Sequence, residues 1–149
     1  MENRFETFTS FIQQINRSIQ RIKSMEMTEF GLKGIHALCL FHLYRAPGRL
    51  TQAELTKLCA EDKATVSRAL SELLDRGFVV DTQPGQAKKY NARLLLTDAG
   101  CTIAEQVERR VDRAVELASA GLTNEEREIL YHCLQTVNEN LGRYTRSAH

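Results

Sequence analysis

One short segment of the chain, residues 62–75, has two chemically different sides if it folds as a helix. Its apolar residues recur at helical spacing and predict a buried side: Val66, Leu70, Leu73 and Leu74. The opposite side and the exposed first turns carry small, polar or basic residues: Lys63, Ala64, Thr65, Ser67, Arg68 and Ser71. We expect the apolar side to pack on Leu55 and Leu58 of a preceding helix.

These outward residues fit the chemistry of a DNA major groove. The guanidinium of Arg68 has two donors for a guanine edge, and the methyl groups of Ala64 and Thr65 suit a thymine methyl. Ser67 and Thr65 can bond to bases or phosphates, and the free amides at a helix start attract a phosphate. A groove about 12 Å wide admits a helix only where its outward side chains are small.

The flanking residues predict the elements that position this helix. Thr51 and Glu54 form a capping-box pattern, which predicts a short helix through Cys59. Thr123 and Glu126 form the same pattern, which predicts the start of the last helix. Asp62 predicts the N-cap of the next helix, and Gly77 predicts its left-handed exit. Two short helices joined by a tight turn indicate a helix-turn-helix.

A basic hairpin is expected directly after the helix pair. Residues 78–83 and 92–97 predict two strands, and the turn-rich residues 84–91 predict the tip between them. Lys88 and Lys89 lie in that tip, where they can contact a minor groove or the phosphate backbone and supply salt-sensitive affinity. A polar helix face alone is commonly just solvated, but a helix-turn-helix followed by a basic wing favours DNA binding.

Helices at both ends of the chain carry narrow apolar stripes at steps of three and four. The N-terminal stripe is Phe5, Phe8, Ile12, Ile15, Ile19 and Ile22, and the C-terminal stripe is Leu130, Leu134, Val137, Leu141 and Tyr144. Such stripes predict helix pairing, and we favour pairing with a second copy over packing within one chain. A twofold dimer would recognise two half-sites about one helical turn apart, on the order of 34 Å, in a near-palindromic operator.

Composition places few further limits on function. The 149 residues carry a formal net charge of +1, and residues 45–95 hold nine Lys or Arg against six Asp or Glu, a local excess of three. The chain has no apolar run of membrane-spanning length and no signal-peptide pattern, so we expect a cytoplasmic protein without a membrane partner.

Cysteine and histidine spacing gives weak indications of a sensor. We expect four free thiols, and Cys59, near Lys57 and Lys63, is the candidate for oxidation. His36 and His42 flank Cys39 at steps of three, but these two histidines diverge by about 120° around a helix. We therefore predict no metal site and no cofactor.

The chain resembles the MarR family of bacterial transcriptional regulators over nearly its whole length. The segments that carry the resemblance are LTQAELTKLCAEDKATVSRALSELLDRGFVV (residues 50–80) and LLLTDAG (residues 94–100). The resemblance implies a mainly α-helical fold with a small β-hairpin wing, a homodimer formed by the end helices, and an unidentified small-molecule effector. The order of the expected helices and strands along the chain predicts three parts: a dimerisation helix (1–30), a winged helix-turn-helix (31–98) and C-terminal dimerisation helices (99–149).

Two departures from the family pattern concern the wing and the second helix. Lys88, Lys89 and Tyr90 stand where the family commonly carries Asp-Arg-Arg, so Lys89 is our substitute for the minor-groove arginine. Arg93, which remains in the wing strand, is a candidate for a structural ion pair. Leu32-Lys33-Gly34 stands where many members have a Thr-Pro cap, which leaves the entrance of an effector pocket undefined.

The leading hypothesis is a homodimeric, sequence-specific DNA-binding repressor that a small ligand or an oxidant modulates. The alternative is a winged-helix adaptor that binds another protein and does not recognise DNA. A thiol enzyme is disfavoured because the sequence has no nucleophile elbow and no phosphate-binding glycine loop. We predict no catalytic residues.

Overall fold

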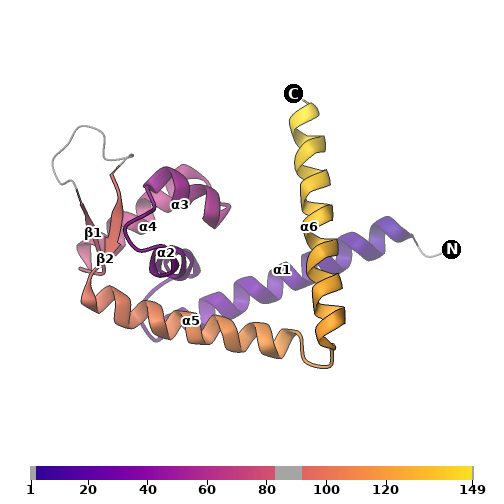
Figure 1. Cartoon of the computed structure of the whole chain (residues 1–149), viewed down its shortest axis with the longest axis horizontal. Helices are drawn as coiled ribbons and strands as arrows, with labels where there is room; N and C mark the ends of the chain where they lie inside the picture. Colours follow the sequence, from indigo (N-terminus) through magenta and orange to yellow (C-terminus); the bar gives the residue numbers. More distant parts are fainter. Residues whose placement is uncertain (1–2, 83–91, 149) are drawn as a thin grey trace. The chain divides into compact units, whose positions relative to one another are not determined.

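The computed structural model of the chain describes residues 3–82 and 92–148. In these ranges the chain forms, in order, α1 (Arg4–Thr28), α2 (Gly34–Arg45), α3 (Gln52–Cys59), α4 (Lys63–Asp75), β1 (Val79–Asp81), β2 (Leu94–Leu96), α5 (Asp98–Ala118) and α6 (Asn124–Ser147), shown in Figure 1. This order confirms the predicted winged helix-turn-helix with long flanking helices. No helix in the described ranges is both long and apolar enough to span a bilayer.

The predicted helix starts are confirmed by their side-chain caps. Glu54 accepts the amide hydrogen of Thr51 at 2.8 Å, and the Thr51 hydroxyl accepts the Glu54 amide in return. Asp62 accepts an amide hydrogen of the first turn of α4 at 2.8 Å. Thr123 and Glu126 form the same reciprocal pair at the start of α6. Each cap satisfies amides that have no partner within their own helix.

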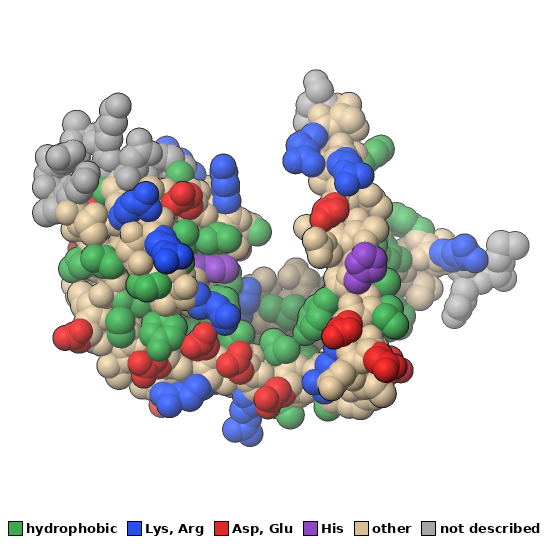
Figure 2. Space-filling view, viewed as in Figure 1, with side chains coloured by type: hydrophobic (Ala, Val, Ile, Leu, Met, Phe, Trp, Pro, Cys, Tyr) green, Lys and Arg blue, Asp and Glu red, His purple; other side chains and the backbone are tan. Residues whose placement is uncertain are grey.

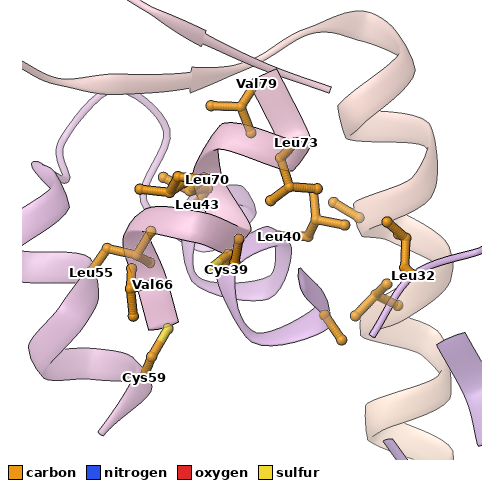
Figure 3. Packing of buried hydrophobic residues seen from close by; sticks show 14 of the residues in the cluster. Leu32, Cys39, Leu40, Leu43, Leu55, Cys59, Val66, Leu70, Leu73 and Val79 are labelled. Atoms are coloured by element: carbon orange, nitrogen blue, oxygen red, sulfur yellow. The ribbon is translucent and has the colours of Figure 1, made fainter. Parts of the chain in front are cut away.

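Two compact units divide the chain, residues 1–110 and residues 111–149. In the first unit, the apolar side of α4 supplies Val66, Leu70 and Leu73 to a core that includes Leu40 and Leu43 of α2 (Figure 3). These five side chains are all at most 2% exposed. Their burial stabilises the orientation of α4, since each buried aliphatic side chain contributes about 1.5–3 kcal/mol.

The expected contribution of Leu58 and Leu74 to this core is wrong. Leu58 is 50% exposed and Leu74 is 39% exposed. In α3 the buried pair is Leu55 and Cys59, which are four residues apart and therefore lie on the same face of the helix. Leu55 thus anchors α4 without Leu58.

The sheet consists of β1 and β2, paired antiparallel with Val79 opposite Leu96 and Asp81 opposite Leu94. Both strands are shorter than predicted because their flanking residues have other roles. The Phe78 amide donates to the Leu73 carbonyl and closes the end of α4. The Thr97 hydroxyl donates to the Gly77 carbonyl at 2.6 Å and accepts an amide hydrogen at the start of α5.

The second unit contains α6 and the end of α5. Gly121 has φ +87° in the connection between them, and the Arg127 guanidinium donates to the Ser119 carbonyl. None of the described residues of α6 is buried. In the first unit, the α1 stripe is exposed as well, from 40% at Ile12 to 74% at Phe5.

Candidate nucleic-acid interface

The outward side of α4 is accessible, as the sequence predicted. Lys63, Ala64, Arg68 and Ser71 are exposed, and Thr65 and Ser67 are half-buried. None of the six candidate contact residues on α4 is buried in the core that holds the apolar side of the helix. The helix therefore presents these six residues as one accessible face.

The first turn of α4 is held by Asp62. Its carboxylate accepts the Thr65 amide and the Thr65 hydroxyl, at 2.8 and 2.9 Å. These hydrogen bonds, the amide first, lower the pKa of Asp62, and the positive charge of Arg68 adds to the effect. The Thr65 hydroxyl donates its hydrogen to Asp62, so toward a ligand it offers an acceptor.

Arg68 differs from Thr65 in having its donors available. Its side chain is exposed, and it forms no hydrogen bond with a residue that the structure describes. A guanidinium in this state can form two parallel hydrogen bonds to a guanine edge without first breaking bonds within the protein. Arg68 is thus the best candidate on α4 for base recognition.

The turn between α3 and α4 contains Ala60 in the left-handed conformation, with φ 53° and ψ 37°. A residue with a Cβ rarely adopts this conformation. Ala60 is alone among the described non-glycine residues in having positive φ. The turn is short because the chain reverses at this single residue before Asp62 caps α4.

Two contacts that the sequence analysis missed attach the C-terminal half of α4 to the segment around the start of α2. Arg76 donates to the carbonyls of Phe30 and Gly31, both at 2.8 Å. Nε2 of the buried His36 lies 2.8 Å from a carboxylate oxygen of Glu72. No local pattern signals these contacts, because the partners are 36 to 46 residues apart in the chain.

The base of the wing is joined to the segment before α3. The Arg93 guanidinium donates to the Arg49 carbonyl, and Thr51 forms a bridge with Arg93. Arg93 therefore has a structural role, through a carbonyl instead of the expected ion pair. The predicted contact residues Lys88 and Lys89 lie outside the described residues.

Charge on the visible face of the molecule is mixed. Over the part that carries α2, α3 and α4, Lys and Arg side chains lie among acidic and apolar ones (Figure 2). This mixture agrees with the small formal net charge of +1. Any nucleic-acid affinity must therefore come from a few well-placed cations and not from a uniformly basic surface.

The oxidation candidate Cys59 is 6% exposed, and it lies in the same core as the fully buried Cys39 (Figure 3). The interaction with Cys59, together with burial, raises the pKa of Cys39. The same interaction lowers the pKa of Cys59. Of the other thiols, Cys101 is partly exposed and Cys133 is exposed.

Comparison with known proteins finds similarity to one family of transcriptional regulators. The profile of the MarR family matches residues 30–89. The HTH-type transcriptional regulator YybA of Bacillus subtilis (strain 168) is 29% identical over 132 residues, covering 89% of this chain and 87% of YybA. A MarR-family regulator from Listeria monocytogenes, solved with a 26-mer DNA, is 26% identical with a TM-score of 0.80, covering 89% of this chain and 87% of that one.

A second solved structure agrees over the full length of the chain. The MarR protein from Peptoclostridium difficile DA00132 superposes with a TM-score of 0.84 at 20% identity, covering 100% of this chain and 96% of that one. At this identity the likeness shows the fold alone. Together with the motifs of residues 50–80 and 94–100 and the capped helix pair, these matches show that the chain is similar to transcriptional regulators of the MarR family in sequence and in fold.

Proposed function

We propose that this regulator binds double-stranded DNA with α4 as its recognition helix and represses transcription from a near-palindromic operator. The observation that carries the proposal is the division of α4 into two sides. Val66, Leu70 and Leu73 hold one side in the core, while the opposite side, with Arg68 at its centre, is accessible. The Listeria monocytogenes relative in complex with DNA supports the same use of the fold.

Each candidate residue has a chemical role in this proposal. Arg68 donates to a guanine edge, and the methyl group of Ala64 contacts a thymine methyl. Ser67 and Ser71 bond to bases or phosphates, and Thr65, whose hydroxyl hydrogen is donated to Asp62, accepts from a base donor. Lys63 and the wing residues Lys88 and Lys89 contact phosphates, which contributes affinity without sequence preference.

We propose that the active form is a homodimer. The exposed α1 stripe, with Phe8 44% and Ile15 55% exposed, and the exposed α6 stripe, with Leu134 43% and Leu141 54% exposed, give each chain large apolar surfaces to cover. A second copy would bury them, because stripes of this periodicity pair with helices of the same kind. Two copies of α4 would then contact successive half-sites.

The proposal describes a binding protein and not an enzyme. The activity that it assigns to the described residues is recognition of DNA, which needs no covalent step. We also propose a cytoplasmic location, where a bacterial regulator meets its DNA. We also propose that an unidentified small molecule regulates the protein, and we assign no residues to its binding site.

For an oxidant signal we propose Cys59, now with Cys39 as its partner. A hydroperoxide would take two electrons and two protons from the two thiols, which would form one disulfide while the peroxide is reduced to an alcohol and water. Because Cys59 ends α3 directly before the turn to α4, such a bond would change the support of the recognition helix.

In vitro selection of duplexes from a random pool by the purified chain tests the proposed function. We expect enrichment of a near-palindromic sequence, and a logarithm of the affinity that falls linearly with the logarithm of the salt concentration. Binding that is tight but identical for all duplexes would contradict sequence recognition. A folded dimer that enriches no sequence and binds no duplex would instead favour a protein-binding adaptor.

A further inference from the structure

A buried histidine joins the start of α2 to the recognition helix. His36 is 3% exposed, and its Nδ1 accepts the amide hydrogen of Lys33, the N-cap residue of α2, at 2.9 Å. Its Nε2 lies 2.8 Å from an Oε2 carboxylate oxygen of Glu72 on α4. One imidazole ring thus contacts both the cap of one helix and a charged side chain of the other.

These two contacts require one protonation state of the ring. Nδ1 can accept from the Lys33 amide only when it carries no hydrogen, so the hydrogen of the neutral ring must be on Nε2. Nε2 lies 2.8 Å from the Glu72 carboxylate, which can only accept. Protonation of His36 would place a second hydrogen on Nδ1, opposite the Lys33 amide hydrogen, and two donors cannot bond to each other.

The groups around the ring favour its neutral form. Burial is the main cause that lowers the pKa of His36 below its ordinary value. Glu72 of α4 acts in the opposite direction, through its charge and its hydrogen bond. The positive charges of Lys33, at the start of α2, and of Arg76, at the end of α4, lower the pKa further.

The contact lies close to the proposed DNA-binding face. Glu72 follows Ser71 directly and is four residues after Arg68, which is about one helical turn. Leu73, the next residue, lies with Leu40 of α2 in the core (Figure 3). The Arg76 hydrogen bonds to Phe30 and Gly31 form a second attachment at the end of the same helix.

We propose that His36 is a positioning residue for the recognition helix, and that its protonation in acid weakens DNA binding. The neutral ring holds Glu72 and caps α2. The charged ring gives up the cap, so the start of α2 moves relative to α4 and the DNA-binding face loses its support. This inference rests on the proposed function, because its effect is measured as affinity for DNA.

Two substitutions separate the two contacts of the ring. His36→Gln places an amide nitrogen near the position of Nε2, where it can donate to Glu72, and has no titratable group. His36→Asn places an amide near Nδ1, where its oxygen can accept from the Lys33 amide, but it does not reach Glu72. His42→Gln is the matched control, because His42 lies on the same helix and its pKa is also lowered, chiefly by burial.

The experiment measures affinity for the selected duplex by fluorescence anisotropy between about pH 7.5 and about pH 5.5, the range in which histidine changes charge. We expect wild-type chain and His42→Gln to lose roughly two- to fivefold in affinity, because the lowered pKa of His36 leaves part of the rings neutral near pH 5.5. His36→Asn, which keeps the cap, should bind as the wild type does near pH 7.5 and lose this acid-dependent step. His36→Gln, which lacks an acceptor for the Lys33 amide, should bind more weakly at both values.

The Glu72→Gln variant tests whether the charge of Glu72 sets the pH at which DNA affinity falls. A histidine with a structural role alone would not make that pH depend on Glu72. The variant keeps an acceptor for Nε2 but removes the charge that raises the pKa of His36. We therefore expect the acid loss of affinity to shift to lower pH. An unchanged midpoint, or the same pH profile in wild type and His36→Asn, would overturn the positioning role while leaving DNA binding intact.

Nitrogen-15 spectra of the histidine rings test the contact without DNA. Near neutral pH, His36 should show the tautomer with hydrogen on Nε2, and the Lys33 amide shift should titrate together with the ring. The opposite tautomer would overturn the inference whatever the affinities are. A folded chain with the expected tautomer that binds no duplex at neutral pH would instead contradict the proposed function.

Discussion

Gly100 at the start of α5 lies directly against the carbonyl group of Phe78: a Cβ added to Gly100 would lie 2.0 Å from that oxygen. The contact explains why residue 100, three positions after Thr97 in the segment LTDAG (residues 96–100), is a glycine. Thr97 bonds to the Gly77 carbonyl and caps α5, and Gly100 lets the helix approach the strand. This corner connects the wing to α5.

We expect Gly100→Ala to lower the free energy of unfolding by roughly 1–3 kcal/mol or more, because neither backbone can move away without strain. Urea denaturation followed by circular dichroism measures the change. Gly142→Ala is the matched control, since it is also helical but has open space around its Cα. The free energy of unfolding of the Gly142→Ala control should rise by roughly 0.5–1 kcal/mol. Equal changes in both variants would contradict the close contact between Gly100 and Phe78.

Arg68→Ala should remove sequence preference at one position of each half-site. We expect a loss of roughly 1–3 kcal/mol on the selected duplex and a much smaller loss on unrelated duplexes. Competition binding measures both values. Arg146→Ala changes the net charge equally from the last turn of α6 and should bind normally. If Arg68→Ala retains the full preference, another residue recognises the base.

Ile15→Glu should convert the dimer to a monomer at micromolar concentration. Ile15 is 55% exposed in the single chain, and a carboxylate in the middle of the stripe would be buried without a partner in the dimer. Light scattering coupled to size-exclusion chromatography gives the mass. Gln13→Glu introduces the same charge on the exposed polar side of α1 and should stay dimeric. A dimeric Ile15→Glu chain would exclude the α1 stripe from the interface.

The four thiols should react at different rates with an aromatic disulfide reagent. We expect Cys133 to react first, because it is exposed, and the buried pair Cys39 and Cys59 to react only as the core opens. Cys133→Ser should therefore lose the fast phase, which is followed by absorbance.

The proposed oxidant response is tested on the Cys133→Ser chain by peptide mapping after hydroperoxide treatment. We expect a disulfide between Cys39 and Cys59, a loss of two hydrogens per chain, and a changed affinity for the selected duplex. Cys59→Ser should abolish both. Oxidation that leaves Cys39 and Cys59 as thiols in the folded chain would contradict the proposal.

Much of the fold could be predicted because its signals are local. The capping pairs at Thr51 and Thr123 and the cap at Asp62 depend on residues at most three positions apart, and all three are confirmed. The two sides of α4 follow from a repeat of 3.6 residues, which the sequence displays directly. The accessible face of Arg68 could therefore be predicted without a structure.

The sequence by itself thus determined the order of the elements, the caps of α3, α4 and α6, and the side of α4 that faces outward. Tertiary structure alone decided what holds α4 in place: His36 at Glu72, Arg76 at Phe30 and Gly31, and Cys39 beside Cys59. It also decided that Leu58 is exposed, although Leu58 lies three residues after Leu55, a helical spacing that is compatible with burial on the same side. The physical reason is that these contacts join residues 20 to 46 positions apart, whose proximity depends on how the helices pack and leaves no periodic trace in the chain.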